Sequence, residues 1–210
     1  MVAEHKYSVN EEAVKVTIRE LHVMAQPVGA FFAWGFDDDG RWVRSADALE
    51  ADTGVLDIGF NTLDLFAVGG GELTKRYTDG DTLGMRRAAE HLIKAVGEAY
   101  GKKLSLHHAD ALIRDSSPTL STSDGRIEIK PLVDQALSHA TSGILSFVQQ
   151  PDRWGDGRQF DHLLITGGGA EALRSQLQGA FPHGYILPHP VTANALGLAR
   201  YARRAFGRRA

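Results

Sequence analysis

A carboxylate lies immediately before a short polar turn in the stretch 55–68. Asp57 interrupts an apolar run that is typical of a buried strand, and Gly59, Asn61 and Thr62 follow it, with Gly59 permitting a positive φ. Backbone N–H groups and a hydroxyl at such a turn can bind an anion such as phosphate, and the carboxylate can hold a metal-bound water. The alternative interpretation is an ordinary hairpin with a solvated aspartate, and this stretch alone does not decide between the two.

A second glycine-rich turn, Gly167–Gly169, follows an apolar segment at 161–166. With Ala172 it satisfies the dinucleotide-binding pattern G-x-G-x-x-A. That function requires an acidic residue about 20 residues further on, to bind a ribose hydroxyl. The chain there runs into Leu187–Pro190 with no Asp or Glu in range, so we reject the dinucleotide interpretation. Three glycines still allow a planar ring or a phosphate to approach the backbone closely.

Gln26 is a third polar group in a notable position. It stands at the start of an apolar helix that Pro27 introduces. From its position alone, Gln26 is expected to cap the helix or to hydrogen-bond nearby backbone.

Periodic segments predict the elements that must hold these turns. The apolar spacing indicates helices at 27–34, 81–100, 105–114 and 131–150, and strands at 14–23, 55–58, 63–68, 126–129, 161–166 and 185–187. A last helix follows Pro190, with a predicted buried stripe of Val191, Ala195, Leu198, Ala202 and Phe206. Arginines gather at its end, where they are expected to form a solvated C-terminus.

Composition excludes several classes of protein. The chain has 210 residues, 43% hydrophobic and 23% charged, with a formal net charge of -3, so a direct nucleic-acid surface is not expected. It has no cysteine, which excludes disulfides and thiolate metal sites. No apolar run approaches the length of a membrane span, and the first 25 residues lack the pattern of a signal peptide. We therefore expect a cytoplasmic globular protein of one large or two small domains.

The two glycine turns, in their order and spacing, resemble the phosphate-2 and adenosine motifs of the actin, heat-shock chaperone and sugar kinase ATPase superfamily. The sequence is most similar to actin-like proteins of the ParM/StbA plasmid-segregation type. Three stretches support this resemblance, which extends from about Tyr7 to Tyr201: Met24–Ala30, Asp57–Asp64 and Leu187–Gly197.

The resemblance implies an α/β, actin-like (ribonuclease H-like) fold with a mixed sheet flanked by helices. Residues 1–50 would be the remainder of a first actin-like domain. Residues 51–210 would form the second domain, and the last helix would be able to pack back on the first.

The resemblance also implies an ATP/ADP and Mg²⁺ site. Asp57 would orient water or Mg²⁺ near the γ-phosphate, and Gln26 would position the attacking water. The expected nucleotide contacts are Gly59, Phe60, Asn61 and Thr62 at the phosphates, Gly167, Gly168 and Gly169 at the adenosine, and Arg86 or Glu90 at the base or ribose.

One departure from the family is important. Its members have an earlier phosphate-1 hairpin of D-x-G type, and we find no such hairpin before residue 55. From the resemblance we therefore expect the sequence to lack roughly the first third of a complete member, and one side of the phosphate clamp with it. Because phosphoryl transfer depends on positioning from both sides, we expect the chain alone to bind ATP weakly or not at all, and not to hydrolyse it.

Three functional hypotheses remain. The first is a part of an ATP-dependent, filament-forming protein that segregates plasmids or other DNA through self-association and a DNA-binding adaptor protein. The second is a metabolic phosphotransferase or polyphosphatase on the same fold, although no sugar pocket is identifiable. The third is a nucleotide-binding module that does not hydrolyse its ligand. Fold alone does not decide among them.

Overall fold

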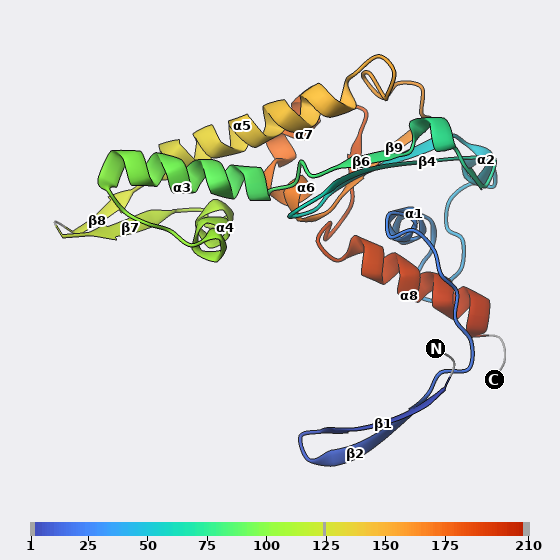
Figure 1. The fold of residues 1–210 in the computed structure, drawn as a ribbon. Helices are drawn as coiled ribbons and strands as arrows, with labels where there is room; N and C mark the ends of the chain where they lie inside the picture. The colour runs from blue at the N-terminus through green and yellow to red at the C-terminus, as the bar shows by residue number, and fades with distance from the viewer. Residues whose placement is uncertain (1–2, 124, 208–210) are drawn as a thin grey trace.

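The computed structural model describes residues 3–123 and 125–207 and shows a mixed sheet between two layers of helices (Figure 1). The sheet has six strands in the order β10-β9-β3-β4-β5, with β6 also paired to β4. Their bounds are β3 (Thr53–Ile58), β4 (Leu63–Gly69), β5 (Glu72–Leu73), β6 (Asp79–Asp81), β9 (His162–Thr166) and β10 (Tyr185–Ile186).

Strand β3 is the centre of this sheet. It pairs antiparallel with β4 and parallel with β9, so that Asp57 lies opposite Asp64 on one side and Thr166 on the other. All six residues of β3 are buried. A strand covered by helices on both faces needs a nearly continuous apolar run, and this explains why the stretch before the turn at residue 59 is so apolar.

One face of the sheet packs against the larger hydrophobic core. It is covered by α3 (Arg86–Tyr100), α4 (Leu106–Arg114), α5 (Lys130–Val148), α6 (Gly168–Ala172) and α7 (Arg174–Ala180). Strands β7 (Thr119–Thr122) and β8 (Gly125–Glu128) form a separate hairpin beside α4 (Figure 1). Helix α3 ends where Gly101 adopts a left-handed conformation, φ 62°.

The opposite face is covered by α1 (Val28–Gly35) and α8 (Ala193–Phe206), which belong to opposite ends of the sequence. Phe31 and Trp34 of α1 form a second core with Val55 of β3 and Phe66 of β4. The short helices α2 (Asp47–Glu50) and η1 (Lys75–Tyr77) complete the connections on this side and at the sheet edge.

The buried stripe predicted for the last helix is wrong. Val191 lies before α8 and is 64% exposed, whereas Ala193 and Gly197 are the buried residues of the helix. The reason is the close crossing with α1, because a Cβ atom on Gly197 would lie 1.7 Å from the carbonyl oxygen of Gly29. The helix turns its small residues, rather than its large ones, toward its partner.

Of the arginines predicted to form a solvated helix end, Arg203 and Arg204 are exposed and Arg200 is partly buried, and all three also contact the chain after α1. Arg208 and Arg209 of the same predicted group lie outside the described residues. Arg200 donates to Asp38 Oδ1 at 2.9 Å and to the Ala33 carbonyl at 2.7 Å, and Arg203 donates to the Asp38 carbonyl. Arg204 lies over the ring of Phe36. These side chains attach the acidic turn after α1 to α8.

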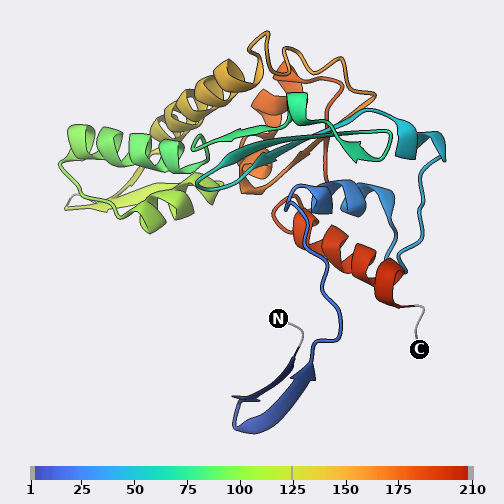
Figure 2. The ribbon, with the colours of Figure 1, turned by 45° about the vertical axis from the view of Figure 1, so that its right-hand side comes forward.

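The N-terminal strands β1 (Glu4–Val9) and β2 (Glu12–Thr17) form a hairpin that projects from the rest of the molecule (Figure 2). Their register places Tyr7 opposite Val14 and His5 opposite Val16, so the apolar side chains share one face. A two-stranded hairpin has little stability by itself. Among the described residues, no helix is long and apolar enough to cross a membrane.

The predicted fold class is confirmed, since the sheet is mixed and helices flank both faces. The division expected at residue 50 stays a prediction. The structure adds that α1, which precedes residue 50, packs on the same sheet as β3.

The crossing of α1 and α8 predicts a large effect for one methyl group. Gly197→Ala is expected to lower the free energy of unfolding by about 2–3 kcal/mol, because the added carbon overlaps the α1 backbone and the helices must separate. Urea denaturation measures the effect. Gly179→Ala in α7 is the matched control, since nothing lies within 4 Å of its new carbon and alanine favours helix by up to about 1 kcal/mol. Equal stability of the two variants would contradict the close crossing.

Candidate functional site

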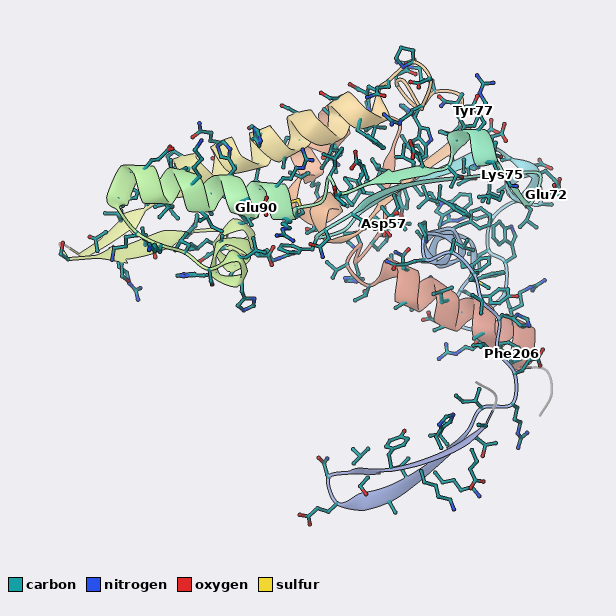
Figure 3. The ribbon with its side chains drawn as sticks, in the orientation of Figure 1. Asp57, Glu72, Lys75, Tyr77, Glu90 and Phe206 are labelled. Atoms are coloured by element: carbon teal, nitrogen blue, oxygen red, sulfur yellow. The ribbon has the colours of Figure 1, made fainter. Side chains whose placement is uncertain are left out.

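Asp57 occupies the end of the central strand, between the sheet and the start of α8 (Figure 3). It is only 3% exposed. Its Oδ2 accepts a hydrogen bond of 2.7 Å from Asn194 Nδ2 on the first turn of α8. Its Oδ1 faces the second glycine turn, since a Cβ atom on Gly167 would lie 2.5 Å from it. The carboxylate is therefore held between two segments that are more than a hundred residues away in sequence.

The environment of Asp57 acts on its pKa in two directions. Burial raises the pKa of the Asp57 carboxyl, because the charged form loses hydration. The hydrogen bond from Asn194 lowers it, the charge of Asp64 raises it, and a hydrogen bond with Gln26 lowers it. The net direction is upward. A carboxylate kept buried at such a cost is typical of a functional site.

Gln26 and Asp57 lie together, as the resemblance implied. Gln26 is exposed, in the turn that leads into α1, and its side chain hydrogen-bonds Asp57. Its backbone carbonyl accepts from Gly29 N at 2.9 Å, which continues the first turn of the helix. The side chain is thus available at the surface above the buried carboxylate.

The hairpin tip is braced by the start of α3. The carbonyl oxygens of Gly59, Phe60 and Asn61 accept hydrogen bonds from the N–H groups of Met85, Arg86 and Gly84, at 3.1, 2.7 and 3.3 Å. In the described part of the chain, no hydrogen bond occupies the N–H groups of Phe60, Asn61 or Thr62. The tip therefore offers donors rather than acceptors, which is the polarity of an anion-binding turn.

Two details of the tip differ from expectation. Gly59 does not adopt a positive φ. Its N–H donates to the Thr62 carbonyl at 2.9 Å, and this turn forms without a positive φ at residue 59. The Phe60 side chain packs against the larger core. Any contact of Phe60 with a ligand would then come from its backbone.

Asp64 is a residue that the sequence analysis missed. It lies opposite Asp57 in the β3–β4 ladder, accepts a hydrogen bond of 3.1 Å from the Thr62 hydroxyl and is partly exposed. The side chains of directly opposed residues lie on the same face of a sheet. Counting two residues back from each side of the predicted turn would have paired Asp57 with Asp64.

The second glycine turn lies so close to the end of β3 that side chains at two of its positions would not fit. Gly167 has a φ of 89°, and a Cβ atom there would lie 2.3 Å from the Ile58 carbonyl. A Cβ atom on Gly169 would lie 2.2 Å from the Ile58 side chain. Gly168 differs from both, because its Cβ would meet only the guanidinium of Arg114, at 3.5 Å. Two of the glycines are required by packing, and the third lies against the guanidinium of Arg114.

Arg86 and Glu90 pair with each other at 2.8 Å on the exposed surface of α3, and Figure 3 shows Glu90 on this helix beyond the sheet. The residue that reaches the second glycine turn is instead Arg114, at the end of α4. Arg114 pairs with Asp110 at 3.0 Å, and the second oxygen of Asp110 is buried without a partner. No motif in the sequence marked this pair, although its spacing of four residues is a common one for helix ion pairs.

The side chains present fit a magnesium nucleotide. Asp57 and Asp64 supply carboxylate oxygens, and Asn194 Oδ1 is buried without a hydrogen-bond partner. Oxygen ligands of this kind suit Mg²⁺, which usually takes only one or two carboxylates and completes its shell with water and phosphate. Across the described residues, no group of three or more His, Cys, Asp or Glu side chains could hold a metal by itself.

Two D-x-G triplets precede residue 55, but neither forms the phosphate-1 hairpin. Asp38-Asp39-Gly40 is a turn that packs on α8, where a Cβ atom on Gly40 would lie 2.8 Å from Arg204 N. Asp52-Thr53-Gly54 enters β3, and Gly54 faces the ring of Phe160. Neither triplet lies in the β1–β2 hairpin.

A mixed sheet with helices on both faces, and a buried aspartate between two glycine turns, is the arrangement of an actin-like protein. The family profile described as "Archaeal actin homologue MreB-like, C-terminal" matches residues 55–179. This is more than half of the chain. The protein therefore belongs to that family of archaeal actin homologues.

Solved structures agree on the fold. An archaeal actin homologue has 16% sequence identity and a TM-score of 0.74, over 93% of this chain and 60% of its own. A ParM from a 15-stranded filament of Clostridium botulinum has 20% identity and a TM-score of 0.69, over 97% of this chain and 60% of its own. ParM of Bacillus thuringiensis with AMPPNP has 15% identity and a TM-score of 0.70, over 98% of this chain and 61% of its own.

These values confirm the predicted actin-like, ParM-type resemblance at the level of fold. The chain spans about three-fifths of the length of these structures. No curated protein sequence matches it.

The pKa of Asp57 predicts the pH dependence of stability. Because that pKa is raised in the folded state, ionisation of Asp57 disfavours folding. The stabilisation from the protonated Asp57 carboxyl is fully present below its ordinary pKa of 3.8 and is lost as the pH rises through its folded-state pKa. Asp57→Asn keeps an acceptor for Asn194 and removes the charge. We expect a higher free energy of unfolding than wild type at about pH 7, and nearly the same value below the ordinary pKa.

Asp79→Asn is the control with the opposite sign. The ion pair with Arg153 lowers the pKa of the Asp79 carboxyl, so its stabilisation is present above 3.8 and is lost as the pH falls through the folded pKa. Urea denaturation at a series of pH values measures both variants. If Asp57→Asn destabilised the fold at neutral pH as Asp79→Asn is expected to, the burial argument for Asp57 would be wrong.

Proposed function

We propose that this chain is the larger part of the nucleotide-binding body of an ATP-dependent, filament-forming actin homologue. The observation that carries the proposal is the hairpin tip, where the N–H groups of Phe60, Asn61 and Thr62 are unpaired and lie beside a buried carboxylate. The structural neighbours support it, since one is described with AMPPNP and another as a filament. Plasmid or DNA segregation is the cellular role that we infer for the complete protein.

In this proposal, each of the site residues has a defined role. The N–H groups of Phe60, Asn61 and Thr62 bind the phosphates, and Gly59, whose own N–H bonds the Thr62 carbonyl, closes the turn that presents them. Asp57 and Asp64 hold Mg²⁺ or its bound water, which would neutralise phosphate charge. Gln26 lies at the surface beside Asp57, where it can orient a water molecule for attack.

The nucleoside is assigned to the second glycine turn, beside Arg114 at the end of α4. Gly168, which unlike Gly167 and Gly169 is not packed against Ile58, allows its close approach, and Arg114, paired with Asp110, lies beside it. A planar guanidinium can stack on a base or donate to ribose and phosphate oxygens. We therefore favour Arg114 over Arg86 and Glu90 as the residue on the base side, since the Arg114 guanidinium lies against Gly168.

Self-association and an adaptor that connects the filament to DNA are the partners that we infer. The chain itself is not expected to bind nucleic acid, because its formal net charge is -3. A cytoplasmic location stays a prediction.

Nucleotide binding tests the assigned groups. Arg114→Ala is expected to weaken the binding of Mg·ADP or Mg·AMPPNP about tenfold, the loss of roughly one charge-assisted contact. Gly168→Ala is expected to weaken it as well, because its methyl group obstructs the close approach of the nucleoside. Isothermal titration calorimetry measures the affinity. Gly179→Ala on α7 is the control, because it adds a methyl group away from the site. If both substitutions left a measurable affinity unchanged, the nucleoside would lie elsewhere.

ATP hydrolysis and filament assembly test the proposed activity of the protein. The described residues supply one side of the phosphate clamp, so the 210-residue chain is expected to show no multiple turnovers of ATP in a phosphate-release assay. Sedimentation and light scattering of the complete gene product with ATP should show assembly that Asp57→Ala abolishes. Multiple turnovers by this chain would overturn the first expectation. Nucleotide binding without assembly of the complete product would favour a non-filamentous module.

A further inference from the structure

The β1–β2 hairpin projects from the body of the molecule, and among the described residues neither of its strands pairs with any other (Figure 2). Asn10 and Glu11, with φ of 48° and 70°, close it in the manner of a type I′ turn. Every residue of β1 is exposed, and Tyr7 and Val9 keep half of their surface in solvent. Because two strands alone are only marginally stable, this hairpin calls for a further strand.

The outer edge of β1 carries a row of backbone groups that a further strand can bind. Ile18 N donates to the Ala3 carbonyl at 2.9 Å, so these two residues are a hydrogen-bonded pair of the ladder. Such pairs alternate along antiparallel strands, and every second residue of β1 therefore directs its N–H and C=O away from β2. These residues are Glu4, Lys6 and Ser8. The six-stranded sheet has no comparable edge, because β5, β6 and β10 at its margins have only two or three residues.

The charges along β1 select one way in which two copies of the strand can pair. In a symmetric antiparallel pair, opposed residues share a face of the sheet, so the two-fold axis passes beside one residue and its own copy. The two registers that overlap most of this six-residue strand are centred on Lys6 and on Tyr7. The first opposes two lysines, which is destabilising. The second sets Lys6 opposite Ser8 and His5 opposite Val9 of the second copy, with no like charges opposed.

We propose that two copies of this chain join along β1 into a four-stranded antiparallel sheet, with Tyr7 at the two-fold axis. Since Tyr7 lies opposite Val14 of β2, an apolar row of Val14, Tyr7 and their copies crosses the joined sheet, and aromatic and β-branched neighbours of this kind stabilise antiparallel strands. The ion pair of Glu4 and Lys15, 2.6 Å apart, stays on the other face. The two bodies lie at opposite ends of the sheet, because each is attached beyond Thr17 and the strands are antiparallel.

Single cysteines test the register of this pairing, because the chain has no cysteine of its own. Under mild oxidation without nucleotide, Tyr7→Cys is expected to form a disulfide-linked dimer, since opposed side chains are closest in a pair that is not hydrogen-bonded. His5→Cys and Val9→Cys are each expected to stay monomeric alone, because each residue lies roughly 14 Å from its own copy. The two variants should cross-link with each other when they are mixed. Non-reducing gel electrophoresis measures the dimers.

Sedimentation equilibrium of the unmodified chain measures the association itself. A single strand pair is a small interface, so we expect a weak dimer whose mass doubles only at high concentration. Ser8→Pro removes an outward N–H on each side of the two-fold axis and is expected to weaken the dimer about tenfold, while proline at a free edge is compatible with the hairpin. Ser8→Ala keeps the N–H and is the matched control.

Three results would overturn the proposal. They are a chain that stays monomeric at every concentration, which would leave the edge to a different polypeptide, a Ser8→Pro variant that dimerises as wild type does, and efficient cross-linking of His5→Cys with itself. All of these measurements are made without nucleotide, so they do not depend on the proposed nucleotide site.

Discussion

The hydrogen bond between Asp57 and Asn194 is the interaction on which the arrangement of this molecule depends. It joins the end of the central strand to the first turn of the last helix, at 2.7 Å. A buried carboxylate without a partner would be very costly, so α8 can occupy only a position that brings Asn194 to Asp57. That position in turn requires the crossing of α1 and α8, where Gly29 and Gly197 leave no room for side chains.

Patterns local in sequence were sufficient to predict most of the framework. The β3–β4 hairpin, the strand and turn at 162–169, and helices α3, α4 and α5 all follow from apolar periodicity and turn residues. The partners of the site were not predictable in the same way. Asn194 is 137 residues from Asp57, and Arg114 reaches Gly168 only through the packing of α4. The stripe on α8 failed because small residues at a helix crossing carry no hydrophobic signal.

Glycine has a different role in each of the two turns. At the tip of the β3–β4 hairpin, backbone conformation does not require it, and the carbonyl groups there are occupied by the start of α3. At residues 167 and 169 the glycines are required by contacts with Ile58. The same residue type therefore marks one turn shaped to present donors and another shaped to let backbones meet, and a sequence pattern cannot distinguish them.

The charge of the site explains why the proposed phosphate and Mg²⁺ sites depend on each other. Asp57 is buried and its pKa is raised, and Asp64 lies beside it, so the site resists further negative charge. The neighbouring N–H groups nevertheless present the polarity that attracts an anion. A phosphate could occupy the tip next to two carboxylates only with a cation between them, because otherwise like charges would repel. The acidic pair and the anion-binding tip are thus consistent with one ligand, a magnesium nucleotide, and with neither component alone.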